Sequence, residues 1–215
     1  MINMVKLPTK KSDLFLRVAK GHFATSHSHI NYYIDVTTQK ARLSEAKAVA
    51  KELVSAYQHS TIVDTVLCLD GTQVIGTCLA NELTKDGFAN MNAHQTIYVI
   101  TPEYTTGSQI ILRDNLAPMV KGKHVLILAA SITTGYTVQA AVEAVNYYGG
   151  MVAGLSAIFA TTHECMDYTG FKAVSMAAKD CAAPARCIIQ GTKGYIQQKS
   201  TANCCGGITF HPNEG

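Results

Sequence analysis

The stretch of residues 123–159 limits the possible folds more than any other part of this chain. It begins with Val-Leu-Ile-Leu at positions 125–128, a short apolar run that is typical of a strand buried on both faces of a parallel sheet. Gly149 and Gly150 later supply a helix stop, and residues 151–159 form the next apolar run. Between them, apolar side chains recur at spacings of three and four and predict one buried helix stripe: Val138, Ala141, Val142, Val145 and Tyr148. The stretch therefore predicts a strand-loop-helix-strand crossover within a parallel sheet.

The loop between this strand and this helix reads Ala-Ala-Ser-Ile-Thr-Thr-Gly-Tyr-Thr from position 129 to position 137. Free backbone N–H groups at a helix start, together with the positive end of the helix dipole, make a natural site for a phosphate. Thr133, Thr134 and Thr137 add hydroxyl donors, and Gly135 lets the backbone approach an anion closely. The alternative is that a threonine simply caps the helix, as threonines often do.

Residues 125–137 resemble the signature V-L-V-V-D-D-x-x-T-T-G-x-T of the type I phosphoribosyltransferases, and within that family orotate phosphoribosyltransferase. In the family the Thr-Thr-Gly-x-Thr half binds the 5′-phosphate of the donor, phosphoribosyl pyrophosphate (PRPP). The resemblance implies the same role here for Ser131, Thr133, Thr134, Gly135, Tyr136 and Thr137.

The sequence departs from this signature at Ala129 and Ala130, where the family has two aspartates. In the family those carboxylates contact the ribose hydroxyls of the donor and help to organise its magnesium ion. The resemblance thus implies a Mg²⁺ cofactor carried by PRPP. It also implies an intact phosphate half of the site and a ribose half that lacks its anions.

A second turn of the same kind follows a predicted strand at residues 64–69 and precedes a predicted helix at residues 74–83. A strand that enters a glycine-containing turn before a helix also favours an anion site, although an ordinary connection would look the same. The family binds pyrophosphate with a loop at this place. The resemblance assigns pyrophosphate binding to Asp70, Gly71, Thr72 and Gln73.

The amino-terminal part predicts a short helix at residues 12–20, then a strand, a polar turn and a second strand at residues 31–36. Residues 21–35 resemble the hood of orotate phosphoribosyltransferases, G-x-F-x-x-x-S-G-x-x-S-x-Y-Y-x-D, which covers the base. By this resemblance Tyr32 and Tyr33 contact the base. The cluster His22, His27 and His29 is read either as a metal site or as polar and substrate-facing side chains.

Residues 43–57 predict a helix capped by Ser44, residues 94–100 a strand, and residues 102–113 a hairpin. In the family this hairpin is a mobile loop whose lysine stabilises the leaving pyrophosphate. Here no lysine lies between Asp86 and Lys121, and Arg113 is the cation of the hairpin. After the strand at residues 151–159, where the family often has an arginine for the orotate carboxylate, this chain continues Ala-Thr-Thr-His.

The 215 residues, with 47% hydrophobic and 15% charged side chains, suit one compact domain. We expect a hood at about residues 1–40, an α/β core at 41–180 and an uncertain tail at 181–215, in which residues 188–196 predict a strand. The tail residues Cys181, Cys187, Cys204, Cys205 and His211 belong either to a zinc site or to an irregular tail or edge strand, and the missing paired C-x-x-C spacing argues against zinc.

The net charge of +3 is spread along the chain, which argues against a nucleic-acid partner. No apolar run is long enough to span a bilayer, and the amino terminus lacks the apolar stretch of a signal peptide. The odd number of seven cysteines favours reduced thiols. The prediction is a cytoplasmic protein without a membrane partner, in which Cys68 and Cys78 are buried.

Taken together, the sequence predicts an α/β fold, a parallel sheet flanked by helices as in type I phosphoribosyltransferases, with a small amino-terminal hood. The resemblance implies a homodimer that transfers phosphoribosyl from PRPP to a pyrimidine base, releases pyrophosphate and serves pyrimidine nucleotide biosynthesis. The missing aspartates leave open a non-catalytic phosphoribosyl- or nucleotide-binding protein, or a scaffold that binds nothing. No catalytic residue and no metal ligand is identified.

Overall fold

A computed structural model describes residues 4–8, 14–24, 29–87, 89–105, 109–132, 135–160, 185–187, 194–199 and 207–212. Its centre is a five-stranded sheet whose neighbouring strands all run parallel. The strand order is β10 (Ala185–Cys187), β9 (Met151–Ala160), β8 (His124–Ile132), β4 (Thr65–Cys68) and β5 (Tyr98–Ile100). The parallel sheet predicted from the crossover is therefore confirmed.

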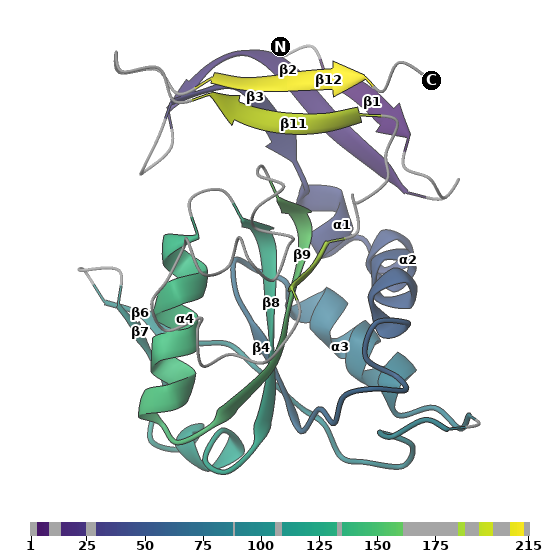
Figure 1. Cartoon of the computed structure of the whole chain (residues 1–215), viewed down its shortest axis with the longest axis vertical. Helices are drawn as coiled ribbons and strands as arrows, with labels where there is room; N and C mark the ends of the chain where they lie inside the picture. The colour runs from purple at the N-terminus through teal and green to yellow at the C-terminus, as the bar shows by residue number, and fades with distance from the viewer. Residues whose placement is uncertain are drawn as a thin grey trace.

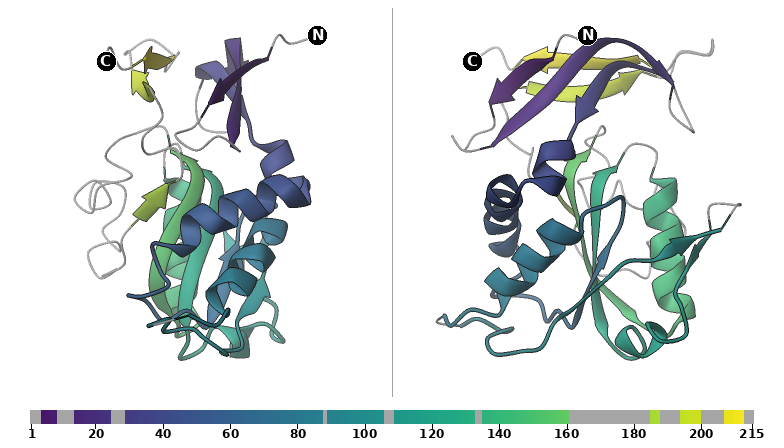
Figure 2. Two further views of the ribbon diagram at one scale, coloured as in Figure 1. Left: turned by 90° about the vertical axis from the view of Figure 1, so that its right-hand side faces the viewer. Right: turned by 180° about the vertical axis from the view of Figure 1, so that it is seen from behind.

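Helices cover both faces of this sheet (Figures 1 and 2). Helix α4 (Tyr136–Tyr147) lies on one face, and α2 (Leu43–Val54) and α3 (Gln73–Leu83) lie on the other. Each face has its own apolar cluster, in which Val138 and Val142 of α4 meet one side of β8 while Leu53 and Leu79 pack on the other side. All four residues of β4 are buried, as expected for a strand covered on both faces.

The chain leaves the middle of the sheet in two opposite directions. From β4 it passes through α3 to β5 at one edge, whereas from β8 it passes through α4 to β9 on the other side. The carboxyl ends of β4 and β8 are therefore the place where the strand order reverses. We call this place the switch point, and it is where parallel α/β sheets usually bind ligands.

The helices follow the predicted apolar stripes, with corrections at their ends. The buried residues of α2 are Ala46, Val49, Ala50 and Leu53. The helix ends at Val54 rather than at residue 57. It begins directly after Arg42, and no side chain caps it, so the prediction that Ser44 is the cap was wrong.

Helix α4 stops where the glycine pair predicted. Gly149 has φ of 76°, its N–H donates to the carbonyl of Asn146, and the N–H of Gly150 donates to the carbonyl of Val145. This is the hydrogen-bond pattern of a Schellman motif, which favours glycine in the left-handed position. The chain then turns directly into β9, as expected.

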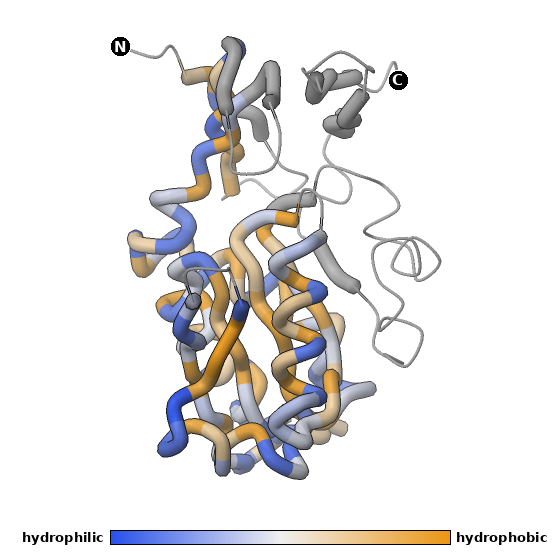
Figure 3. Tube along the Cα trace, turned by 90° about the vertical axis from the view of Figure 1, so that its left-hand side faces the viewer, coloured by the Kyte–Doolittle hydropathy of each residue, from blue (hydrophilic) through white to orange (hydrophobic). Residues whose placement is uncertain are grey.

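The hood is a separate antiparallel sheet of β1 (Val5–Pro8), β2 (Phe15–Ala24) and β3 (His29–Asp35). The predicted helix at residues 12–20 was wrong, because residues 15–20 belong to β2. Leu16 and Val18 are buried while Phe15 is exposed, which is the period of two of a strand. Figure 3 shows hydrophobic and hydrophilic residues interspersed along the coloured part of the hood.

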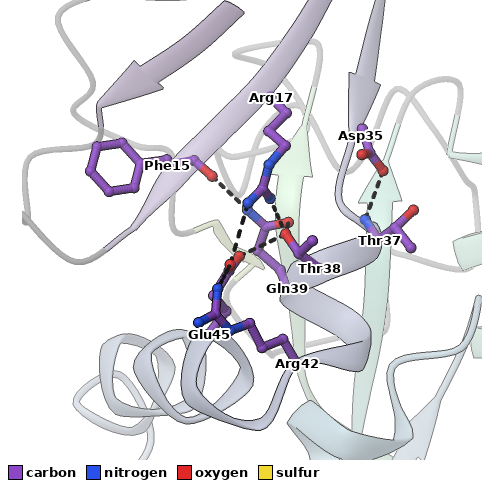
Figure 4. A network of polar contacts seen from close by, with 8 residues as sticks. All are labelled: Phe15, Arg17, Asp35, Thr37, Thr38, Gln39, Arg42 and Glu45. Atoms are coloured by element: carbon purple, nitrogen blue, oxygen red, sulfur yellow. Dashed lines mark hydrogen bonds and ion pairs between the residues drawn. The ribbon is translucent and has the colours of Figure 1, made fainter. Parts of the chain in front are cut away.

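A polar network joins the hood to the helices beneath it (Figure 4). Arg17 of β2 donates to the hydroxyl of Thr38 in α1 (Thr37–Ala41), and its Nη2 lies 3.4 Å from Oε1 of Glu45 in α2. The side-chain amide of Gln39 donates to the carbonyl oxygen of Phe15 at 2.5 Å. Helix α1, which was not predicted, therefore connects the hood with the core.

The remaining elements are short. The predicted strand at residues 94–100 is shorter in the structure, because β5 covers Tyr98–Ile100. The predicted hairpin is present as β6 (Glu103–Tyr104) and β7 (Ile110–Ile111), followed by the 3₁₀ turn η1 (Ala117–Met119). In the tail, β11 (Gly194–Lys199) pairs with β12 (Gly207–Pro212). The predicted strand at 188–196 coincides with β11 at residues 194–196, and its residues 188–193 lie outside the described part of the chain. No helix of the described residues is long and apolar enough to cross a membrane.

Candidate functional site

The predicted phosphate loop lies at the carboxyl end of β8. The strand continues through Ala129 and Ala130 to Ile132, so the first half of the motif is a strand and not a loop. Gly135 then precedes α4 with φ of 84°, a backbone conformation that favours glycine. Ser131 is exposed, Tyr136 is 63% exposed and Thr137 is partly buried. Thr133 and Thr134 lie outside the described residues, and phosphate binding by this loop stays a prediction.

The second predicted turn lies beside it, at the carboxyl end of β4. Asp70 and Gly71 have φ of 52° and 78°, so the chain makes a left-handed turn before α3. Thr72 is fully buried, and its hydroxyl donates to the carbonyls of Leu69 at 2.8 Å and Leu128 at 3.0 Å. Its N–H also donates to Leu69. Thr72 thus stabilises the turn through its hydroxyl and its N–H, and pyrophosphate binding by residues 70–73 stays a prediction.

Asp70 reaches from this turn across to β8. Cys68, the last residue of β4, is opposite Leu128 in the parallel register, and Asp70 follows two residues later in the turn. The backbone N–H of Ala130 donates to the Asp70 carboxylate, and Nζ of Lys40 lies 2.8 Å from the carbonyl oxygen of Asp70. Burial raises the pKa of the Asp70 carboxyl and outweighs the lowering by Lys40 and Ala130. Asp70 as a residue is exposed, whereas its carboxyl group is partly desolvated and accepts the hydrogen bond from Ala130.

The two alanines that replace the aspartate pair are integral to the sheet. Ala129 is 1% exposed and belongs to the apolar cluster beneath α4, while Ala130 is 3% exposed. A methyl side chain offers no hydrogen bond or charge to a ligand. Among the described residues at the carboxyl ends of β4, β8 and β9, Asp70 is consequently the carboxylate at the switch point.

The hairpin of β6 and β7 also reaches the switch point. Burial and the negative charge of Asp70 raise the pKa of the Tyr104 hydroxyl. The backbone N–H of Asp70 donates to this hydroxyl and lowers the same pKa by a smaller amount. Arg113, the cation of this hairpin, instead pairs with Glu103, to which its Nε donates at 2.5 Å. The positive charge of Arg113 is therefore paired with the carboxylate of Glu103 in the same hairpin.

The predicted base-contacting residues lie in the hood. Tyr32 and Tyr33 are central in β3, opposite Lys20 and Ala19, and Tyr33 is 39% exposed. Consecutive strand positions belong to opposite faces of a sheet, so at most one of the two positions lies on the face turned toward the core. Base binding by either residue stays a prediction.

The metal alternatives find no support in the described part of the chain, which contains no group of three or more His, Cys, Asp or Glu side chains suited to a metal ion. His27, Cys181, Cys204 and Cys205 lie outside the described residues. Cys68 and Cys78 are buried and free of disulfides, as predicted. Burial raises the pKa of Cys68 to about 12, so this thiol is not a reactive thiolate.

Sequence reasoning missed two members of this site, Lys40 and Tyr104. Lys40 precedes Asp70 by 30 residues, and Tyr104 follows it by more than 30. Neither position carries a local pattern that distinguishes it from a surface residue. Helix α1 brings Lys40 to the switch point, and the β6–β7 hairpin brings Tyr104, so only the packed fold identifies them.

Phosphoribosyltransferases are among the solved structures with the same architecture. The orotate phosphoribosyltransferase of Aeropyrum pernix aligns with a TM-score of 0.54 and 16% identity over 79% of this chain and 86% of that one. The adenine phosphoribosyltransferase of Thermoanaerobacter pseudethanolicus aligns with a TM-score of 0.50 and 14% identity over 87% of this chain and 95% of that one.

The UMP synthase of Leishmania donovani aligns with a TM-score of 0.53 and 19% identity over 80% of this chain. The alignment spans only 33% of the UMP synthase. No protein-family model matches the sequence, and no curated protein matches it either. The structural likenesses show that this chain has the type I phosphoribosyltransferase fold.

Proposed function

We propose that this protein transfers a phosphoribosyl group from PRPP to a nitrogenous base and releases pyrophosphate, with orotate or a related pyrimidine as the base. One observation carries the proposal most directly. The two turns that the sequence resemblance assigns to phosphate and pyrophosphate end neighbouring strands, β8 and β4, at the switch point of the sheet. A ligand with two phosphate groups joined by a sugar suits such an arrangement.

In this reaction a nitrogen of the base attacks the anomeric carbon of PRPP. The new carbon–nitrogen bond forms as the bond to the pyrophosphate oxygen breaks, the electron pair leaves with pyrophosphate, and the base nitrogen loses its proton to solvent. The start of α4 would hold the 5′-phosphate, and the backbone at Gly71 and Gln73 would hold the leaving group. Magnesium that accompanies PRPP supplies neutralisation of the pyrophosphate charge.

Lys40 supports this reading because it brings a cation to the pyrophosphate turn. Its Nζ is 2.8 Å from the Asp70 carbonyl, and a side chain attached at the Gly71 Cα would lie 3.8 Å from that Nζ. In the family the corresponding charge comes from the mobile loop, where this chain has Arg113 paired with Glu103. Lys40 would therefore balance negative charge that develops on the leaving pyrophosphate.

A second function, binding of a phosphoribosyl compound without chemistry, is favoured by Ala129 and Ala130. A hydrogen bond to a charged group contributes about 1.5–3 kcal/mol, so the loss of both family carboxylates corresponds to roughly 3–6 kcal/mol. At about 1.4 kcal/mol per tenfold in rate, turnover would fall by 100- to 10,000-fold if nothing compensates. The two functions thus differ in turnover and share the binding site.

The test is to mix purified protein with PRPP, magnesium and either orotate or adenine, and to follow base consumption and pyrophosphate release together. Stoichiometric loss of base and release of pyrophosphate establishes the transferase. Thr134→Val should abolish it, whereas the matched variant Thr96→Val, an exposed threonine before β5, should not. Binding of PRPP by calorimetry without turnover would establish the second function and overturn the first.

A further inference from the structure

We infer that Asp70 is the ribose-binding residue of this protein, and that its carboxylate accepts hydrogen bonds from the hydroxyls of a bound sugar phosphate. This inference rests on the proposed function, since it takes the ligand to be a phosphoribosyl compound. The anionic group of the site would then lie in the turn after β4, whereas in the family it lies at the positions of Ala129 and Ala130 in β8. It also gives Asp70 a role different from contact with pyrophosphate.

A hydrogen bond to the neighbouring strand places this carboxylate. Asp70 lies in the turn that follows β4, and the backbone N–H of Ala130 in β8 donates to its carboxylate. This hydrogen bond brings the Asp70 carboxylate directly against the backbone of β8, which carries no side-chain anion at positions 129 and 130. Both alanine side chains are buried and apolar, so a sugar bound here finds its acceptor on Asp70.

Charge decides which ligand group this carboxylate meets. Two anions repel, so the Asp70 carboxylate and a diphosphate oxygen do not make direct contact. A divalent cation on Asp70 would be repelled by the ammonium of Lys40, whose Nζ is 2.8 Å from the Asp70 carbonyl. A neutral pair of hydroxyls suffers neither repulsion, and its two O–H groups match the two oxygens of a carboxylate.

The backbone supports the same role. Asp70 has φ of 52°, a region in which aspartate, asparagine and glycine are much commoner than other residues. The buried hydroxyl of Thr72 ties the turn to the carbonyl of Leu128 in β8. Lys40 and Tyr104 hold the carbonyl and the N–H of Asp70 from two other elements. The carboxylate is thereby held in place before a ligand binds.

The test uses the full chain and ribose 5-phosphate, 2-deoxyribose 5-phosphate and inorganic phosphate as probes in calorimetric titrations. The key variant is Asp70→Asn, which suits the same φ and removes only the charge. The matched control is Asp86→Asn, an exposed aspartate in the segment after α3, whose helix leads away from the switch point. Asp70→Gly is a second variant that also suits a positive φ.

The parent should bind ribose 5-phosphate more tightly than 2-deoxyribose 5-phosphate. Asp70→Asn and Asp70→Gly should weaken ribose 5-phosphate binding by about 10-fold or more and reduce the preference over the deoxy sugar. Binding of inorganic phosphate and the melting temperature should change little, and Asp86→Asn should match the parent. An affinity of Asp70→Asn for ribose 5-phosphate within twofold of the parent would overturn the inference.

The outcome is independent of the turnover assay. If the protein shows no turnover while ribose 5-phosphate binding depends on Asp70, the proposed transferase fails and the ribose-binding role stands. If turnover occurs and Asp70→Asn binds the sugar phosphate as the parent does, the transferase stands and this inference fails. A parent that does not distinguish ribose 5-phosphate from phosphate also overturns the inference.

Discussion

Arg17 of the hood and Glu45 of helix α2 face each other across the junction between the two parts of the protein, with 3.4 Å between Nη2 and Oε1. Both side chains are mostly buried, with 21% and 17% of their surfaces exposed. Thr38 completes the contact, because its hydroxyl donates to Oε2 of Glu45 at 2.7 Å. The position of the hood over the switch point therefore depends on a charged contact between largely buried side chains (Figure 4).

Replacing Arg17 by glutamine should loosen this junction. The change removes the positive charge that pairs with the Glu45 carboxylate. We expect a loss of about 1–3 kcal/mol in the free energy of unfolding, measured in urea. Amide hydrogens of β2 and β3 should exchange faster than those of the core. Arg42→Gln is the matched control, since Arg42 also pairs with Glu45 but is 69% exposed and should cost less than about 0.5 kcal/mol. Equal losses for both variants would contradict the prediction.

Asp64 should make the free energy of unfolding depend on pH in the acid range. Burial raises its pKa, but hydrogen bonds from the backbone N–H and the ring of His124, at 2.8 and 2.9 Å, lower it more, so the net pKa lies below the usual 3.8. The unfolded chain then binds the proton more tightly, so this stabilisation is present above about pH 4 and is lost as the pH falls through the folded pKa.

Asp64→Asn should therefore destabilise the protein by about 1–3 kcal/mol near neutral pH and by less near pH 3. The measurement is the free energy of unfolding in urea at both pH values. Asp86→Asn is the control and should change the free energy of unfolding little, because the contact of Asp86 with His94 lies at the exposed surface. A difference between Asp64→Asn and the parent that stays constant with pH would rule out this role for Asp64.

Thr72 should matter for the shape of the site rather than for direct binding. Thr72→Val removes the hydroxyl that joins the turn to Leu69 and Leu128, and we expect a loss of about 1–2 kcal/mol in unfolding free energy. Thr72→Ser keeps the hydroxyl and should restore most of this stability together with ligand affinity. If the serine variant were as weak in binding as the valine variant, the methyl group and not the hydroxyl would be the important part.

Gly76 should not accept even alanine. A Cβ there would lie 2.3 Å from Sγ of Cys68 and 3.3 Å from Cγ1 of Val99. Alanine normally stabilises a helix by about 1 kcal/mol over glycine, but the overpacking should reverse the sign and cost about 1–3 kcal/mol.

The double variant Cys68→Ala/Gly76→Ala checks the cause. Removing the sulfur makes room for the new methyl group, so the double variant should be more stable than the sum of the single changes predicts, by about 1 kcal/mol or more. Urea unfolding under reducing conditions measures all three variants. Additive losses would show that the clash with Cys68 is not the reason.

Local patterns in the sequence were sufficient for the parallel sheet and its helices. The apolar run at residues 125–128, the stripe of α4 and its glycine stop all appear in the structure as predicted. Such patterns indicate which face of a helix or strand is buried, because the spacing of apolar residues along the chain follows the local geometry of that element. They failed at residues 12–20, where alternate burial of Leu14, Leu16 and Val18 makes a strand in the hood.

Other features of the site were decided only by tertiary structure. The motif showed that Ala129 and Ala130 lack the family's carboxylates, but it did not show that the backbone N–H of Ala130 binds the carboxylate of Asp70. Nor did any pattern connect Lys40 or Tyr104 with Asp70. The sequence by itself thus determined the elements and the two turns, because periodicity and turn residues act locally. The packing of distant segments determined which polar groups meet, because those contacts join residues 30 or more positions apart.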